Sequence, residues 1–563
     1  MASPRNIVRW LFAADSGPRT RFVPRWFFLR ALGAIYFSAF LALVFQIKGL
    51  IGPDGILPAR HFLHVVASDA DTLRYWYAPT LFWIFSGSHF LMAVTWIGLL
   101  ASIAAFLNVW PRLSFFICLV CFLSFVAAAG DFSGYQSDGM LLEAGFIALF
   151  FVPRGLGPGW GTHSPPPRAA LFLLQYEWFR IYFESGIGKL LSGDPEWRHL
   201  TAMDEYYQNG PLPTWIGWYV EHFPHWFQVA TAAGTLVMEI GIVWMLFLPR
   251  RLRLICFFIV TPWEIGVILT ANYAFLNYLV LFLGFLLLDD RSVRWLVPAR
   301  FRGTLDEAAR PPATAAQDER PISILAPAQE DTEAGVGAEP RALRREVGDR
   351  PVRGWRGLRS ALGVAVTAIF LTWIAYNTTA EMIRMPWPDA PVFTAPIEWL
   401  EPFRIANQYG LFEVMTRGRY EIEFQGSNDG QTWVPYTFLH KPQALNQAPG
   451  IYAPYQPRFD WNLWFASLTD WQQASIVPLT EERLLDGDRD VLALFRGDPF
   501  PNAPPKYVKA VIYQYWFTSE AEKHATGNWW KRELLGLYAP ELTKVANGKF
   551  GVVEWPEPLP PHE

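Results

Sequence analysis

The chain has 563 residues, of which 52% are hydrophobic, 16% are aromatic and only 17% are charged. A soluble protein usually carries about a quarter charged residues, so this composition favours a membrane protein. The net charge of −4 argues against a nucleic-acid partner, because such proteins present a basic surface.

A membrane-spanning helix needs roughly 20 mostly apolar residues. By this criterion the sequence predicts a polytopic α-helical membrane bundle of about nine transmembrane helices, with a basic N-terminus at 1–25, about eight spans within 26–289 and a last helix at 358–377. The predicted spans are residues 26–48, 89–109, 113–130, 139–153, 168–191, 226–248, 252–271, 274–289 and 358–377.

The distribution of Arg and Lys predicts the orientation, because cytoplasmic loops are enriched in both. With the N-terminus in the cytoplasm, the segments that become cytoplasmic contain eleven of these residues, against three in the short outer loops. Nine spans then place everything after residue 378 outside the cytoplasm.

Residues 290–357 join the last two predicted spans. They are rich in Ala, Pro, Arg and Glu and show no steady apolar periodicity. We predict a largely disordered cytoplasmic linker here. A regulatory element is the alternative.

The pattern changes again in residues 391–563. Residues 420–424 alternate apolar and charged side chains, a dense turn signal follows at 426–430, and the extended pattern resumes at 433–438. Residues 506–518 are dense in β-branched and aromatic residues, which strands favour. We therefore predict a β-rich extracytoplasmic domain, an antiparallel sheet or sandwich.

Large aromatic residues cluster between these predicted strands, flanked by Arg458 and Asp460. Buried Trp, Tyr and Arg side chains dominate the binding energy of many interfaces, so the cluster is a candidate client-binding surface. The alternative is that these residues form the domain core or dock the domain onto the bundle. The candidate residues are Tyr409, Phe412, Arg458, Asp460, Trp461 and Trp464.

The predicted span 168–191 contains Glu177, Arg180, Glu184 and Lys189. A charge at the centre of such a helix costs roughly 2.5–3.5 kcal/mol even on the lower scales. The first three lie within about 60° of one another on the helix, so Arg180 is predicted to neutralise both carboxylates in part. A structural ion cluster is the simplest interpretation.

Lys189 lies near the outer end of the same predicted helix, on a different face. It either extends to the membrane interface, which is the commoner arrangement, or serves as a base with a lowered pKa. Glu239 and Glu264 are further acids in predicted spans. If these side chains face one cavity, a polar chamber open to the outside is expected, with proton or ion transport as a further functional alternative.

The sequence favours neither a metal site nor a cofactor. Cys118 and Cys121 have the CxxC spacing, but they lie inside an apolar run. His61/His64 and His222/His225 have the HxxH spacing without a third ligand at a suitable position. The predicted outer domain contains no cysteine, which excludes a disulfide framework there.

Long stretches of the chain resemble the lipase maturation factor family. The resemblance covers almost the whole sequence except the extreme termini and the linker. The stretches that carry it are WFFLRALGAIYFSAFLALVFQIKGLIGPDGILP (26–58), SGIGKLLSGDPEWRHLTAMDEYYQNGPLPTWIGWYVEHFP (185–224), FRIANQYGLFEVMTRGRYEIEFQGSNDGQTW (403–433), APYQPRFDWNLWFASL (453–468) and PFPNAPPKYVKAVIYQYWFT (499–518).

This resemblance implies a non-enzymatic membrane chaperone that helps secreted lipases reach their folded, active state. Eukaryotic members lie in the endoplasmic-reticulum membrane with their C-terminal domain in the lumen. The high Arg content and the cysteine-free outer domain fit a bacterial member in the inner membrane. Its implied partners are a secreted, lipase-like client and membrane lipids.

The segment SGIGKLLSGDPEWRHLTAM (185–203) also resembles part of the vitamin K-dependent γ-carboxylase. In that enzyme the lysine of a similar G-x-x-K-L pattern is the base, and Lys189 is the matching position. This shorter resemblance implies an alternative function, namely a membrane enzyme that acts on a lipid, quinone or peptide through Lys189.

Overall fold

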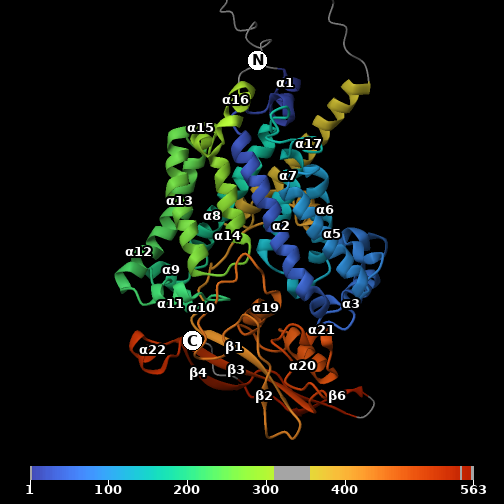
Figure 1. The fold of residues 1–563 in the computed structure, drawn as a ribbon, viewed down its shortest axis with the longest axis vertical. Helices are drawn as coiled ribbons and strands as arrows, with labels where there is room; N and C mark the ends of the chain where they lie inside the picture. Colours follow the sequence, from blue (N-terminus) through green and yellow to red (C-terminus); the bar gives the residue numbers. More distant parts are fainter. Residues whose placement is uncertain (1–2, 310–354, 546–547, 559–563) are drawn as a thin grey trace, which may run out of the picture.

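The computed structural model describes residues 3–309, 355–545 and 548–558. Figure 1 shows a helical bundle at one end of the molecule and a sheet domain at the other. The first helix, α1 (Pro4–Phe12), lies at the end of the bundle far from the sheet, together with α15 and α16. The N-terminal helix and the sheet domain therefore lie at opposite ends of the molecule.

A helix is present in each of the nine predicted spans. Within the described residues, five helices or helix runs are long and apolar enough to cross a membrane: α2, α5, α12 with its continuation to Phe247, α13 and α17. The bundle helices are α2 (Phe22–Ile51), α5 (Ser88–Phe106), α6 (Pro111–Val126), α7 (Gln136–Phe151), α8 (Arg168–Leu191), α12 (His225–Leu236) continued by η5 (Val237–Gly241) and η6 (Ile242–Phe247), α13 (Arg250–Thr270), α14 (Leu276–Gly284) continued by η7 (Phe285–Leu287), and α17 (Trp355–Arg384).

The other bundle helices do not meet this criterion of length and apolar composition, for two reasons. The helices α6, α7 and α14 are short, whereas α8 has the length but carries five charged side chains. Short elements connect the bundle helices: η1 (Ala14–Ser16), α3 (Ala59–Ala70), η2 (Asp71–Leu73), α4 (Arg74–Tyr77), η3 (Leu81–Trp83), η4 (Gly130–Ser133), α9 (Pro195–His199), α10 (Tyr206–Asn209), α11 (Trp215–Glu221), α18 (Ala395–Leu400) and η9 (Glu401–Phe403).

The first part of the predicted linker is folded, which corrects the expectation of disorder for residues 290–309. These residues form α15 (Asp290–Val293), η8 (Arg294–Leu296) and α16 (Ala299–Ala308). The Asp290 carboxylate accepts the backbone N–H groups of Phe22 and Val23 at 3.1 and 2.7 Å, so it caps the start of α2. Residues 310–354 of the predicted linker lie outside the described residues.

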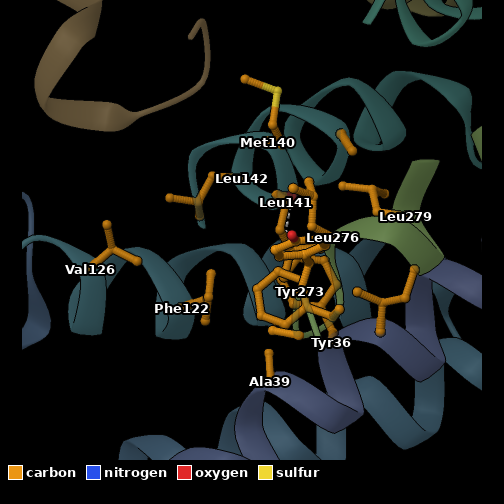
Figure 2. Close-up of a cluster of buried hydrophobic side chains, with 14 of the residues drawn as sticks. Tyr36, Ala39, Phe122, Val126, Met140, Leu141, Leu142, Tyr273, Leu276 and Leu279 are labelled. Carbon is orange, nitrogen blue, oxygen red and sulfur yellow. Dashed lines mark hydrogen bonds between the residues drawn. The ribbon is translucent and has the colours of Figure 1, made fainter. Parts of the chain in front are cut away.

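The helix α2 is the centre of the bundle, and it packs most closely on α5. A Cβ atom on Gly98 of α5 would lie 2.3 Å from the Phe40 ring, so only glycine permits this approach. Figure 2 shows the apolar core beside it, where Tyr36 donates its hydroxyl proton to the carbonyl of Leu141 at 3.0 Å. All three cysteines are free and buried in this bundle.

The C-terminal domain contains one six-stranded antiparallel sheet, as predicted from its turn and strand signals. The long strand β3 is central and pairs with β1, β4 and β5, while β2 and β6 lie at the edges. The strands are β1 (Arg419–Ser427), β2 (Val434–Pro435), β3 (Tyr507–Phe517), β4 (Trp530–Leu537), β5 (Glu541–Lys544) and β6 (Phe550–Glu554).

The predicted hairpin is confirmed, because β1 and β2 pair with Gln425 opposite Pro435, across the turn that contains Gly430 at φ +71°. Helices cover the sheet in place of the second sheet that a sandwich would need, with α20 packed on β3 and α19 on β1. The domain's helices are α19 (Arg458–Ala466), α20 (Ile476–Asp486), α21 (Arg489–Leu492) and α22 (Glu520–Thr526). Because α19 and α21 also contact α2, they join the sheet to the bundle.

Candidate functional site

A cavity of 610 Å³ lies in the bundle among α8, α12, η5, α13 and α14. Residues 409–412, which precede the sheet, close it on the side of the C-terminal domain. Much of its lining is aromatic or aliphatic. The ionisable side chains in the lining are one lysine, two glutamates and five tyrosines: Lys189, Glu239, Glu264, Tyr182, Tyr206, Tyr207, Tyr273 and Tyr409.

Lys189 is buried in this cavity, so the prediction that it extends to the membrane interface is wrong. Its side chain is 4% exposed, and Nζ lies 2.9 Å from Oε2 of Glu239. The same ammonium group donates to Ser185 Oγ and lies 3.4 Å from the Leu411 carbonyl oxygen. With the carboxylate, hydroxyl and carbonyl as acceptors, Lys189 is held as a buried, paired cation.

Glu239 reaches this lysine because of two local features. It lies within η5, a single π-helical turn between α12 and η6. Such turns are rare in proteins, and where they occur they often lie at functional sites. Opposite it, α8 presents Gly186, where a Cβ atom would lie only 2.8 Å from the Glu239 Cβ. The glycine therefore lets the two helices approach closely enough to form the ion pair.

Glu264 from α13 provides the second acid of the cavity. Its Oε2 accepts the hydroxyl proton of Tyr182, which lies one helical turn before Ser185 on α8. Asn277 on α14 lines the cavity nearby and makes no side-chain hydrogen bond within the described residues. The cavity therefore combines a satisfied ion pair with polar groups that remain available to a ligand.

The remaining intramembrane charges form a separate cluster, so the predicted single polar chamber is only partly correct. Arg180 pairs with Glu143 of α7 and lies 3.6 Å from Glu184. Neither oxygen of Glu177 has a hydrogen-bond partner in the described parts of the chain, so of the two carboxylates that Arg180 is predicted to neutralise in part, only Glu184 lies within ion-pair distance. The partner from α7 was not predictable from helical spacing, because it lies on another helix.

This second cluster holds the segment that precedes the sheet. Arg180 donates to the Asn407 carbonyl at 2.6 Å, and Glu184 accepts the Tyr409 N–H at 2.7 Å. Glu143 accepts the Asn407 N–H at 3.0 Å. The charges in α7 and α8 therefore bind backbone of the C-terminal segment and fix the residues that close the cavity.

Tyr409 and Phe412 form part of that closure and are not an exposed client surface. Tyr409 is buried and lines the cavity. Phe412 has φ +55°, an uncommon conformation for a residue with a side chain, and its ring packs 5.4 Å from Tyr206 and 5.3 Å from Tyr273. The Trp197 indole N–H donates to the Phe412 carbonyl at 2.9 Å, which holds the segment in place.

The other residues of the predicted client surface are also buried, and three of them attach the domain to the bundle. Arg458 forms a bidentate ion pair with Asp138 of α7, at 2.7 and 2.8 Å, and both side chains are fully buried. The Trp461 ring stacks on Tyr135 at 5.3 Å. The burial of these side chains therefore agrees with the alternative interpretation, in which they dock the C-terminal domain onto the bundle.

Of the two further members of that set, Trp464 also contacts the bundle part, whereas Asp460 acts inside the C-terminal domain. Trp464 donates its indole N–H to the carbonyl of Asn209 at 3.0 Å. Asp460 accepts the backbone N–H groups of His440 and Lys441 at 3.1 and 3.2 Å, which orders the loop before α19. Both side chains are buried.

The HxxH pairs lie in separate places. His222 contacts the carbonyl oxygens of Trp218 and Thr518 at 2.7 and 3.0 Å, while His225 pairs with Asp204 at 3.0 Å. His61 and His64 are exposed on α3. The cavity residues that the sequence did not single out include Tyr182, Ser185, Trp197, Tyr206, Tyr207 and Tyr273. Of these six, only Ser185, four residues before Lys189, had a local signal.

The comparisons with known proteins cover both parts of this architecture. Residues 23–295 match the family model described as "Lipase maturation factor transmembrane domain", and residues 405–540 match "Lipase maturation factor C-terminal domain". Lipase maturation factor 2 of Gallus gallus is 32% identical over 92% of this chain and 81% of its own length. The chain belongs to the lipase maturation factor family.

Other members of the family show the same extent of similarity. Lipase maturation factor 2 of Homo sapiens is 29% identical over 92% of this chain and 83% of its own length. Lipase maturation factor 1 of Mus musculus is 29% identical over 97% of this chain and 93% of its own length. No solved structure matches. The family prediction is confirmed, whereas the bacterial placement and the carboxylase resemblance stay predictions.

Proposed function

We propose that this member of the lipase maturation factor family is a membrane-bound factor that assists the folding or assembly of a secreted, lipase-like hydrolase. The observation that carries the proposal is similarity along nearly the whole chain to proteins named lipase maturation factor 1 and 2. Both family domains lie in one chain, in the order membrane part and then C-terminal part.

The contacts between the two parts support this proposal. The pair of Arg458 with Asp138 is fully buried, and the backbone of Asn407 is bound by Arg180 and Glu143. These contacts hold the sheet domain against one end of the bundle. A client that engages the domain is thereby kept beside the membrane, where a newly translocated chain emerges.

We also propose nine spans, a cytoplasmic N-terminus and an extracytoplasmic C-terminal domain, in a bacterial inner membrane. The opposite placement of α1 and the sheet in Figure 1 supports this topology, as does the concentration of Arg in the segments on the side of α1. The test is a membrane-impermeant maleimide applied to Arg9→Cys and Lys531→Cys variants, at positions where the native side chains are 67% and 54% exposed.

Labelling of Lys531→Cys from the outside, with Arg9→Cys labelled only after the membrane is opened, is the expected result. The reverse pattern, or labelling of both variants in intact cells, would contradict the topology. The three native cysteines are buried and serve as the background measurement in the unsubstituted chain.

The function is tested by secretion of a lipase from cells that lack this chain, contain it, or contain an Arg458→Ala variant. We expect the specific activity of the secreted lipase to fall without the chain and with the variant, because the variant leaves Asp138 buried without its cation. Arg9→Ala, which removes an exposed arginine, is the matched control. Equal specific activity with and without the chain would refute the proposed function.

The geometry of Lys189 gives less support to the carboxylase-like alternative. A general base needs a free lone pair, whereas the Lys189 nitrogen is surrounded by the acceptors of Ser185, Glu239 and Leu411. The enzyme alternative requires that Lys189→Ala abolishes function in a protein that is still expressed and inserted. The transporter alternative requires substrate or proton flux in proteoliposomes.

A further inference from the structure

We propose that the cavity beside Lys189 binds one neutral, single-chain acyl lipid with a hydroxyl-bearing headgroup, of the monoacylglycerol class. The inference goes beyond the proposed function and does not rest on it. It follows from three properties of the cavity: where it opens, how large it is, and which polar groups face it.

The cavity is open along α13, one of the helices suited to crossing a membrane. Ile259, Pro262 and Gly266 line the cavity and are at the same time exposed on the molecular surface. They follow one another at three- and four-residue intervals and therefore share one face of the helix. A Cβ atom on Gly266 would meet no atom within 4 Å. A ligand can thus enter sideways from the membrane's acyl chains.

The size of the cavity fits a single-chain lipid. Its 610 Å³ lies within the range of about 300–1,000 Å³ typical of small-molecule sites. At roughly 30 Å³ per group, the share of one water molecule in the liquid, it holds about 20 non-hydrogen groups. That is the size of one acyl chain with a glycerol-sized headgroup. Val267, Val280 and Phe227 provide apolar wall for the chain.

The charges select a neutral headgroup. The lining contains one cation, Lys189, and this is already paired with Glu239 at 2.9 Å. Glu264 adds a second carboxyl group without a cation of its own in the lining. A phosphate or carboxylate headgroup would meet this excess of acidic groups and would be disfavoured. A hydroxyl, by contrast, can donate to a carboxylate.

The available hydrogen-bonding groups match hydroxyls. Glu264 uses one oxygen for Tyr182, which leaves the other as an acceptor. The Asn277 amide and the Tyr409 hydroxyl line the cavity without a hydrogen-bond partner in the described residues, so each can both donate and accept. A glycerol headgroup with two free hydroxyls can use all three, whereas a methyl ester offers acceptors only.

The test is photo-crosslinking of the purified full-length protein in phosphatidylcholine nanodiscs with a diazirine-bearing monoacylglycerol. Unlabelled monooleoylglycerol, oleoyl lysophosphatidate and methyl oleate serve as competitors, and mass spectrometry locates the crosslink. We expect labelling on α12 or α13 that monooleoylglycerol displaces, with the anionic lipid and the ester at least roughly tenfold weaker, equivalent to about 1.4 kcal/mol.

Two variants make the result specific to this cavity. Gly266→Phe should fill the opening and reduce labelling roughly tenfold. Gly363→Phe is its control, since that glycine on α17 also has no atom within 4 Å of an added Cβ and does not line this cavity. Asn277→Leu removes no side-chain hydrogen bond within the described residues, so the variant should still be labelled. The difference between monooleoylglycerol and methyl oleate as competitors should become smaller.

Equal labelling of Gly266→Phe and the unsubstituted protein would overturn the proposal, because the lipid would then be bound elsewhere. Equal displacement by lysophosphatidate would overturn the assignment of a neutral headgroup. Since binding is measured without a lipase, either failure leaves the proposed maturation function untouched, and failure of lipase maturation leaves the lipid site untouched.

Discussion

Asp138→Asn should release the C-terminal domain from the membrane bundle. The substitution preserves the shape of the side chain but removes its charge, and Arg458 is left as a fully buried cation. Arg458 would keep its hydrogen bond to the Phe132 carbonyl, at 2.8 Å, its stacking over Phe125 at 4.7 Å and one hydrogen bond to the amide oxygen introduced at position 138. None of these replaces the lost negative charge, so we expect a loss of about 3–5 kcal/mol, the usual cost of breaking a buried pair.

Hydrogen exchange of the purified full-length protein measures this loss directly. The helix α19 begins with Arg458 at the interface, and its backbone amides should exchange faster by roughly one hundredfold to several thousandfold. Each loss of about 1.4 kcal/mol in stability corresponds to a factor of ten in the exchange rate. The amides of α20, which pack on β3 inside the domain, should change less.

Two further variants show whether the buried charge is responsible. Asp138→Leu with Arg458→Met should recover most of the protection, because apolar replacement of a whole buried pair is often neutral. Arg483→Met, which removes a partly exposed pair with Asp488 at 3.4 Å, should cost less than about 1 kcal/mol. If Asp138→Asn leaves exchange in α19 unchanged, the buried pair does not hold the domain and the argument is refuted.

Three other predictions concern the cavity and the domain core. Lys189→Met should reduce the free energy of unfolding by about 3–5 kcal/mol and so lower the thermal midpoint, because Glu239 loses its cation. Adding Glu239→Gln should restore much of this stability. An unchanged midpoint in the single variant would show that the ion pair does not stabilise the protein. Gly186→Val should cost about 1–3 kcal/mol through overpacking against η5, whereas Gly363→Val, in open space, should not. Burial raises the pKa of Glu481 well above its usual value of about 4.5, so the folded protein retains a proton that the unfolded chain releases, and stability should fall as the pH rises above that usual value. In thermal measurements across this pH range, the stability of the Glu481→Gln variant should depend less on pH. Parallel curves of stability against pH for the variant and the unsubstituted protein would show that Glu481 does not cause the dependence.

Much of the local structure was determined by local pattern. The predicted span 168–191 and the observed α8 have the same bounds, and the predicted strand 506–518 contains β3. The turn at 426–430 joins β1 to β2 as its composition indicates. Such predictions succeed because hydrophobic runs, β-branched residues and glycine turns act over a few neighbouring residues. Residues 290–309 show the limit, since α15 and α16 carry no such apolar run.

Sequence by itself therefore determined the family, the helical and β-rich parts, and the presence of costly charges inside apolar helices. Tertiary structure alone decided which partners those charges have: Lys189 meets Glu239 from another helix, and Arg458 meets Asp138 across 320 positions of the chain. Helical periodicity shows which side chains share a face, but it does not show which neighbouring surface that face meets. Since a charge in an apolar environment is stable only with a partner, that long-range packing is also what separates a buried pair from a lysine at the membrane interface.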